Sequence, residues 1–297
     1  MRYLRTRKTH VIFFGALLLW GCEAILNNML TTPMVQNGYQ SKINYQGMLE
    51  RKYAQNGAFA VDTFSVASGD ERTRRFEVWY PSELKNSNKT WPVVVMANGT
   101  GVFASRYKPI FEHLASWGFI VVGNEDGSSW WGHGTATTLD FVLAQQTSKE
   151  SPLYGKVNIS TIGLAGHSQG GVGSFHAAAD FDNSNRYKAI CAMSGNDPTV
   201  AEKIQSPVLL MMGTKGLDAN GMKGVNECFD KITSQPVIVG RLSNTDHGEV
   251  LTKGDAYMTA WMRYWLCGDL EAGKCFLGDS AEMLSNEAWQ DVKREGM

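Results

Sequence analysis

A glycine-rich turn between a short apolar strand and a helix largely decides what this chain can fold into. The turn is Gly166–Gly171, with the sequence GHSQGG, and it joins the apolar run Thr161–Ala165 to the helical pattern Gly170–Ala179. Glycines on either side of Ser168 allow the strand and helix backbones to approach closely, so the serine is expected at the tip of a sharp turn. This strand–turn–helix arrangement predicts a nucleophile elbow, and the alternative is a tight turn with a purely structural role.

Strand-like and helix-like segments alternate along most of the chain around this turn. The first two strands are separated by the turn signal at 68–70, which predicts an antiparallel hairpin. Alternation of strands and helices in the rest of the chain predicts right-handed βαβ units, and therefore an α/β fold with a mostly parallel sheet of about eight strands and helices on both faces. Functional loops should then follow the carboxyl ends of the strands. The expected strands are Phe59–Ala67, Arg74–Tyr80, Pro92–Ala97, Phe119–Gly123, Thr161–Ala165, Lys188–Met193, Pro207–Met212 and Pro236–Gly240. The other expected helices are Tyr107–Trp117, His133–Gln146, Met222–Ile232 and Ala256–Leu266.

The first residues of the chain indicate export. Four basic residues within positions 2–8 precede the apolar stretch Val11–Trp20, which is typical of a secretory signal and shorter than the ~20 residues that span a bilayer. Leu19–Cys22 resembles a bacterial lipobox, although Trp20 is unusual there. We therefore expect a signal peptide or membrane anchor at 1–22, a tether or N-terminal arm at 23–57, and a catalytic domain at 58–297. The alternatives are an uncleaved anchor and a buried N-terminal helix. The expected location is periplasmic or extracellular, with membrane anchoring through the N-terminus.

The charge balance excludes one class of partner. Lys and Arg number 28 against 29 Asp and Glu, for a net charge of −1, whereas proteins that bind the phosphate backbone of nucleic acids usually carry a clustered basic excess. No nucleic-acid partner is expected.

Five cysteines suit an exported protein, because disulfides persist in that environment. With Cys22 as a lipid site, four remain. Cys267 and Cys275 are close in sequence with glycines between them, and we expect them to pair. Cys191 lies in an apolar strand and is expected to be a buried free thiol, with pairing to Cys228 as the less favoured alternative. No Cys/His spacing predicts a metal site.

A serine hydroxyl needs a base, and His247 is the best placed of the six histidines. It lies in a loop after the last expected strand, late in the chain, as the order Ser, acid, His of this fold requires. His113 is expected on a helix surface, and His167, beside the nucleophile, is expected to point away from it. His133 and His176 fall in a glycine-flanked loop and in the helix after the elbow.

The acid that orients His247 is expected to be Asp218, on the loop after the strand Pro207–Met212. Asp197, after the preceding strand, is the competing candidate. Asp246 adjoins His247 and can hardly fold back onto its ring. For Asp218 and Asp197 the alternative role is a carboxylate in a turn or a helix cap.

Two backbone N–H groups are expected to form an oxyanion hole. The N–H of Gln169 lies at the helix N-terminus, where partial positive charge favours an anion. The second donor should come from the loop after Pro92–Ala97, where we expect Thr100, with Gly101 as the next choice and a flexible turn as the alternative. Trp130 and Trp131, on a Gly/Ser loop, suit either an apolar substrate cleft or core packing.

These residues together resemble the α/β-hydrolase superfamily over roughly residues 58–266. The chain is most similar to secreted polyester hydrolases and cutinase-like lipases, with the related dienelactone-hydrolase and chlorophyllase types. The resemblance is carried by 98–100, 114–119, 166–174, Asp218 and His247, and it continues through 256–266 with Cys267 and Cys275. It implies a Ser-His-Asp ester hydrolase that needs no cofactor.

The sequence departs from two groups of this family. Polyester hydrolases have Met after the nucleophile and an aromatic residue at the first oxyanion position, where this chain has Gln169 and Thr100. Dienelactone hydrolases have Cys where this chain has Ser168. We expect a carboxylic ester hydrolase acting through an acyl-enzyme on a small-molecule or polymeric ester. A thioesterase, peptidase, polyester hydrolase or acyltransferase on the same scaffold, and a non-catalytic binding protein, remain alternatives.

Overall fold

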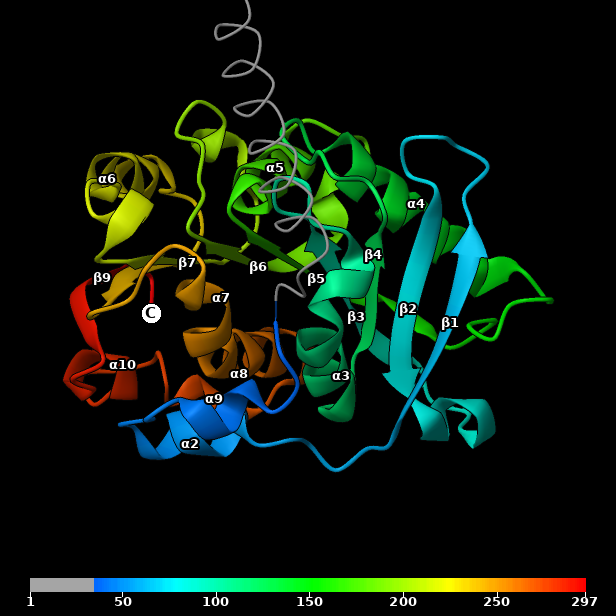
Figure 1. Cartoon of the computed structure of the whole chain (residues 1–297), viewed down its shortest axis with the longest axis horizontal. Helices are drawn as coiled ribbons and strands as arrows, with labels where there is room; N and C mark the ends of the chain where they lie inside the picture. Colours follow the sequence, from blue (N-terminus) through cyan, green and yellow to red (C-terminus); the bar gives the residue numbers. More distant parts are fainter. Residues whose placement is uncertain (1–34) are drawn as a thin grey trace, which may run out of the picture. The chain divides into compact units, whose positions relative to one another are not determined.

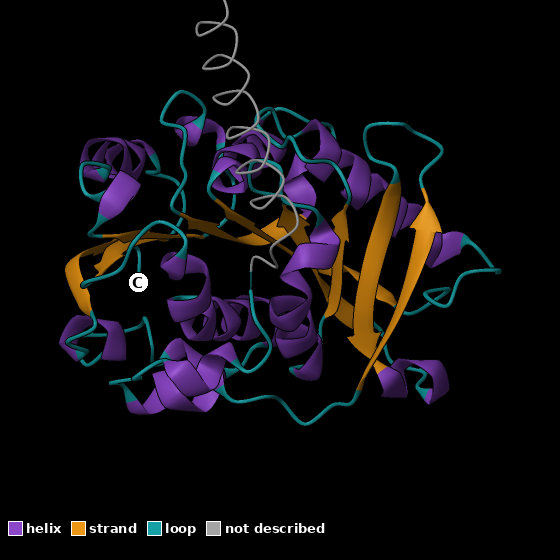
Figure 2. Ribbon diagram, viewed as in Figure 1, coloured by secondary structure: helices purple, strands orange, loops and turns teal. Residues whose placement is uncertain are grey.

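The computed structural model describes residues 35–297, which form a nine-stranded sheet covered by helices on both faces (Figure 1, Figure 2). The predicted signal peptide or anchor and Cys22 lie outside these residues. No helix within the described part is long and apolar enough to cross a membrane. In chain order the strands are β1 (Val61–Ala67), β2 (Arg75–Pro81), β3 (Trp91–Ala97), β4 (Ile120–Asn124), β5 (Val157–His167), β6 (Tyr187–Met193), β7 (Val208–Gly213), β8 (Val237–Leu242) and β9 (Trp289–Glu295).

The sheet order is β1-β2-β4-β3-β5-β6-β7-β8-β9, with β5 at its centre. Strands β3 to β8 run parallel, while β1 and β2 form the predicted antiparallel hairpin and β2 pairs antiparallel with β4. The mostly parallel α/β sheet is confirmed. The ninth strand, β9, was not predicted, because its charged sequence WQDVKRE buries only Trp289 and forms an antiparallel edge on β8.

Helices cover the two faces of the sheet in two groups. In Figure 1, α4, α5 and α6 lie above the sheet, while α3, α7 and α8 lie below it. Helix α8 runs close under the centre, since a Cβ on Gly163 of β5 would lie 2.6 Å from Met262 Sδ. The α-helices are α2 (Met48–Ala54), α3 (Lys108–Ser116), α4 (His133–Thr147), α5 (Gln169–Ala179), α6 (Met222–Lys231), α7 (Glu249–Lys253), α8 (Asp255–Cys267), α9 (Leu270–Gly273) and α10 (Glu282–Ser285). The 3-10 helices are η1 (Tyr39–Lys42), η2 (Ser82–Asn86), η3 (Ala104–Tyr107), η4 (Ser184–Arg186), η5 (Ala201–Lys203) and η6 (Gly216–Asp218).

The segment before β1 belongs to the folded unit, and the predicted start of that unit at residue 58 is wrong. From residue 35 onward the chain packs on the face formed by α8 and α10. Tyr53 of α2 is fully buried, and Glu282 of α10 accepts hydrogen bonds from the N–H groups of Leu49 and Glu50 at 2.6 and 2.8 Å. The Asn- and Gln-rich composition of this segment predicted a tether. The prediction failed because the apolar face of α2 is short and the acceptor that caps this helix comes from the far end of the chain.

The predicted disulfide is not formed. Cys191, Cys228, Cys267 and Cys275 are all free thiols. Cys267 ends α8 at the surface, whereas the short helix α9 follows and leaves Cys275 buried. The alternative pairing of Cys191 with Cys228 is also not formed, and Cys191 is the buried thiol that its apolar strand predicts.

Candidate active site

Ser168 lies at the turn between β5 and α5 in a conformation that few non-glycine residues adopt. Its φ is 60° and its ψ is −124°, and such a backbone costs of order 1–3 kcal/mol, which the surrounding structure must offset. The glycines beside it allow this turn to form. A Cβ on Gly166 would lie 2.1 Å from the carbonyl oxygen of Gly170, and one on Gly170 would lie 2.1 Å from that of Ala97. No side chain fits at either position.

The structure brings Ser168, His247 and Asp218 together from three separate loops at the carboxyl ends of β5, β8 and β7. Ser168 Oγ lies 2.8 Å from His247 Nε2, and His247 Nδ1 lies 2.6 Å from Asp218 Oδ1. Asp218 is buried and the other two side chains are half-buried. In this geometry a neutral imidazole that donates Nδ1–H to the carboxylate leaves Nε2 free to accept the serine proton.

Asp218 is held as a carboxylate by several donors besides His247. Burial raises the pKa of its carboxyl, but hydrogen bonds from His247, from the Ser194 hydroxyl at 2.6 Å and from the Gly213 N–H at 2.8 Å outweigh that effect and lower it. Sequence reasoning missed Ser194. Its signal was its place directly after β6, the strand beside the one that precedes Asp218.

Asp197 and Asp246 do not contact the His247 ring and make hydrogen bonds with other groups. Asp197 Oδ2 lies 3.0 Å from His176 Nε2, while His176 Nδ1 lies 2.9 Å from Asp180. Asp246 accepts hydrogen bonds from the N–H groups of residues 248 and 249 at the start of α7, which is the capping role that its position favours.

His113 differs from its predicted surroundings, whereas His133 does not. His113 is buried, not on the helix surface, because its Nδ1 lies 2.6 Å from Asp255 of α8 and its Nε2 lies 2.8 Å from the carbonyl oxygen of Gln55. His133 begins α4, at the predicted start of that helix, and packs edge-on against Phe181.

His167, as predicted, does not face the serine. Its Nε2 lies 2.7 Å from the backbone oxygen of His247, and its ring is buried. Burial lowers the pKa of His167 to about 4, so the ring is neutral at pH 7 and Nε2–H is the donor. His167 therefore fixes the backbone of the loop that carries His247.

Four N–H groups in the loop after β3 have acceptors within the protein. The N–H groups of Asn98, Gly99, Gly101 and Val102 donate to Ser129 Oγ, Tyr107 Oη, and the carbonyl oxygens of Gly127 and Gly99. Among the described residues, the Thr100 N–H and the Gln169 N–H at the start of α5 make no hydrogen bond. Both groups are therefore free to bind an anion.

Trp130 and Trp131 lie on the surface, so core packing is not their role. Their side chains are 48% and 65% exposed. Trp131 contacts the His176 ring of α5, with centroids 5.2 Å apart, and the glycine after it lies against the α5 backbone near Ala177.

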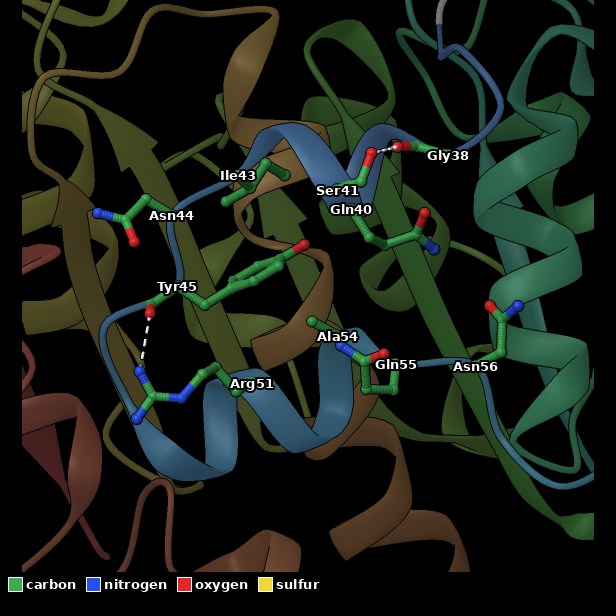
Figure 3. Close-up of a pocket in the computed structure, with 10 residues that line it drawn as sticks. All are labelled: Gly38, Gln40, Ser41, Ile43, Asn44, Tyr45, Arg51, Ala54, Gln55 and Asn56. Atoms are coloured by element: carbon green, nitrogen blue, oxygen red, sulfur yellow. Dashed lines mark hydrogen bonds between the residues drawn. The ribbon is translucent and has the colours of Figure 1, made fainter.

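A separate polar cavity of about 560 Å³ lies around η1 and α2 (Figure 3). It is lined by residues within 38–56, including Gln40, Asn44 and Gln55, and by none of the residues around Ser168. Among residues 35–297, no group of three or more His, Cys, Asp or Glu side chains has the arrangement of a metal site.

The sheet order, with a strained serine turn after its central strand, is that of an α/β-hydrolase. Comparison with protein families identifies a narrower family within this superfamily. The model of the PET hydrolase-like family matches residues 46–293, and the chain belongs to this family of hydrolases. A chlorophyllase type 0 from Chenopodium album is 24% identical over 166 residues, which cover 51% of this chain and 48% of that protein. The chain thus aligns with about half the length of this relative.

Proposed function

We propose that this protein is a carboxylic ester hydrolase that acts through an acyl-enzyme on Ser168. The observation that carries the proposal is the continuous hydrogen-bonded chain from Ser168 Oγ through His247 to Asp218, with contacts of 2.8 and 2.6 Å. Membership of a family named for polyester hydrolysis supports an ester as the substrate.

In the proposed reaction, Ser168 Oγ attacks the ester carbonyl carbon while its proton passes to His247 Nε2. The N–H groups of Thr100 and Gln169 stabilise the oxyanion that forms. When the tetrahedral intermediate collapses, His247 gives the proton to the leaving alcohol. A water molecule then attacks the acyl-enzyme with His247 again as base, which releases the acid and restores Ser168. Asp218 orients the imidazole and stabilises its charged form.

Trp130 and Trp131 are proposed to contact the apolar part of the ester. Their support is exposure on a loop at the same edge of the sheet as Ser168, which makes apolar surface accessible to a substrate. A series of p-nitrophenyl esters of increasing acyl length, run with Trp130→Ala and Trp131→Ala, tests this role: KM should rise most for the longest esters.

The main test is hydrolysis of p-nitrophenyl acetate by purified wild type and Ser168→Ala. Removal of the nucleophile should lower kcat by several orders of magnitude. Ser160→Ala is the matched control, because this exposed serine lies on the same strand, β5, in its first half. Near-full activity of Ser168→Ala would overturn the proposal. Matched amide and thioester substrates, and a polyester film, separate the ester hydrolase from the other acyl enzymes.

A further inference from the structure

We propose that Ser129 is a positioning residue that holds the two oxyanion donors in one fixed arrangement. The inference rests on the proposed function, since it concerns how the site of that reaction is built. Ser129 lies in the loop between β4 and α4 and belongs to neither donor segment.

Ser129 makes one hydrogen bond to each side of the oxyanion hole. Its N–H donates to Gln169 Oε1 at 2.6 Å, and its Oγ accepts from the N–H of Asn98 at 3.1 Å. Gln169 supplies one of the proposed donors from its own backbone, and Asn98 lies two residues before Thr100, which supplies the other. A single residue therefore bridges two segments that are far apart in the sequence.

The bridge is buried. Ser129 and Gln169 are each 4% exposed, and Asn98 is 1% exposed. Water does not compete for hydrogen bonds in such a place, so each bond constrains geometry strongly. Ser129 also lies directly on α5, because a Cβ on Gly173 would be 2.0 Å from its carbonyl oxygen.

The loop that contains Ser129 is itself fixed to the loop after β3. Asn98 Nδ2 donates to the carbonyl oxygens of Asn124 and Asp126 at 2.7 and 2.8 Å. The N–H of Gly101 donates to the carbonyl oxygen of Gly127 at 2.8 Å. Bonds on both sides of Thr100 thus connect its segment to the β4–α4 loop, and the Ser129–Gln169 bond is the hydrogen bond from that loop to the turn at Ser168.

Oxyanion donors act by being aimed in advance at the place where negative charge develops. If the Ser129 bridge is lost, each donor keeps its N–H, and β3 still pairs with β5, but the spacing between the donors loses the constraint that the bridge adds. Binding of the uncharged ester should change little, whereas stabilisation of the tetrahedral intermediate should fall. The expected signature is a lower kcat at nearly constant KM.

Two single variants and their combination test the bridge. Gln169→Met keeps the backbone N–H and the side-chain length but removes Oε1, and Ser129→Ala removes the Oγ acceptor. Each should lower kcat about tenfold with KM within about twofold, and should weaken inhibition by a phenylboronic acid, a tetrahedral analogue, by a similar factor. Because both bonds belong to one bridge, the double variant should be about as slow as the slower single variant rather than slower by the product.

Ser128→Ala is the control, since the neighbouring hydroxyl makes no hydrogen bond within the described residues, and it should keep wild-type kcat. Ser129→Thr retains an Oγ acceptor and should recover most of the activity lost in Ser129→Ala. Unchanged kcat and boronic-acid affinity in folded Gln169→Met and Ser129→Ala would overturn the bridge while leaving the ester hydrolase intact. Wild-type activity that survives in Ser168→Ala would instead overturn the proposed function, and the bridge with it.

Discussion

The hydroxyl of Ser194 lies 2.6 Å from Asp218 Oδ2, while His247 Nδ1 contacts the other oxygen of this carboxylate, Oδ1. Ser194 directly follows β6 and has a positive φ of 51°, which few residues other than glycine adopt. Its N–H donates to the carbonyl oxygen of Met211 at 2.8 Å, so the backbone that places the hydroxyl is held by the neighbouring strand. The carboxylate proposed to orient His247 is itself oriented by this serine.

Replacement of Ser194 by alanine should lower kcat/KM for p-nitrophenyl acetate by about tenfold, since a hydrogen bond to a charged group contributes roughly 1.5 kcal/mol. The loss of one donor should also raise the pKa of the Asp218 carboxyl. Steady-state kinetics at neutral pH measure the first effect, and an NMR titration of the carboxyl below pH 5 measures the second.

Ser206→Ala provides the control, because that buried hydroxyl also donates a 2.6 Å hydrogen bond, to the carbonyl oxygen of Tyr187, but near the start of β7. It should lower stability without lowering kcat. Equal activity of wild type and Ser194→Ala would show that Asp218 needs no support from Ser194.

The features predicted from the sequence were those with strong local signals. Continuous apolar runs predicted the parallel strands, and glycines around Ser168 predicted the turn where strand and helix backbones come within van der Waals contact. Chain order then selected His247 and Asp218, whose side chains meet in the structure. Their catalytic roles, like those of Thr100 and Gln169, remain predictions.

The features that were missed depend on contacts between distant parts of the chain. The Ser129 bridge joins three segments, and nothing in the local sequence distinguishes Ser129 from Ser128. His113 has no local signal for burial, because Asp255 neutralises it from another helix. Strand β9 is predominantly polar and becomes a strand only because β8 offers an unpaired edge.

A pH dependence of stability follows from His167. Burial lowers the pKa of this imidazole to about 4, whereas in the unfolded chain it is about 6.5. Between these values the unfolded state binds more protons, so His167 makes the free energy of unfolding fall as the pH falls from 6.5 to 4. This shift in pKa corresponds to a loss of roughly 3 kcal/mol in the free energy of unfolding below pH 4.

His167→Gln keeps a donor for the His247 carbonyl and removes the titration. Urea denaturation at pH 4.5, 5.5 and 6.5 should show a shallower pH dependence for this variant than for wild type. His133→Gln, which changes an exposed imidazole, should behave like wild type. Parallel curves for wild type and His167→Gln would contradict the assignment.

The His113–Asp255 pair attaches the segment before β1 to the core. Tyr39 Oη also donates to Asp255, and the Gln55 carbonyl oxygen accepts from His113, so two parts of this segment are attached to the buried pair. Asp255→Asn should lower the free energy of unfolding by about 3–5 kcal/mol, because it removes the counter-charge of the buried imidazolium, which must then give up its proton. Urea denaturation measures the loss.

The same pair predicts a pH effect of opposite sign to that of His167. Burial lowers the pKa of His113, but the Asp255 carboxylate raises it by more, so the net shift is upward. The stabilisation is fully present below pH 6.5 and is lost as the pH rises through the folded-state pKa. The cost of Asp255→Asn should therefore be smaller at pH 9 than at pH 6. Asp279→Asn, a surface carboxylate, should cost little at either pH, and an equal cost at both pH values for Asp255→Asn would contradict the charged pair.

Gly195, which follows Ser194, supports the strained turn from the side. A Cβ at this position would lie 2.0 Å from the Ser168 carbonyl oxygen and 3.1 Å from the Val172 nitrogen, which are backbone atoms and cannot move aside as a side chain would. Gly195→Ala should therefore displace the turn, lower kcat at least 100-fold and cost roughly 3 kcal/mol or more of stability.

Gly155→Ala isolates the effect of this contact from the general cost of replacing a glycine. Gly155 has a positive φ of 66°, and a Cβ there meets nothing within 4 Å. Backbone strain alone should lower the stability of this variant by about 1 kcal/mol, with full activity. Thermal melting and p-nitrophenyl acetate turnover of both variants give the comparison. If Gly195→Ala were as active as Gly155→Ala, the loop after β6 could not be what keeps Ser168 in its strained conformation, and the support would have to come from Gly166 and Gly170 alone.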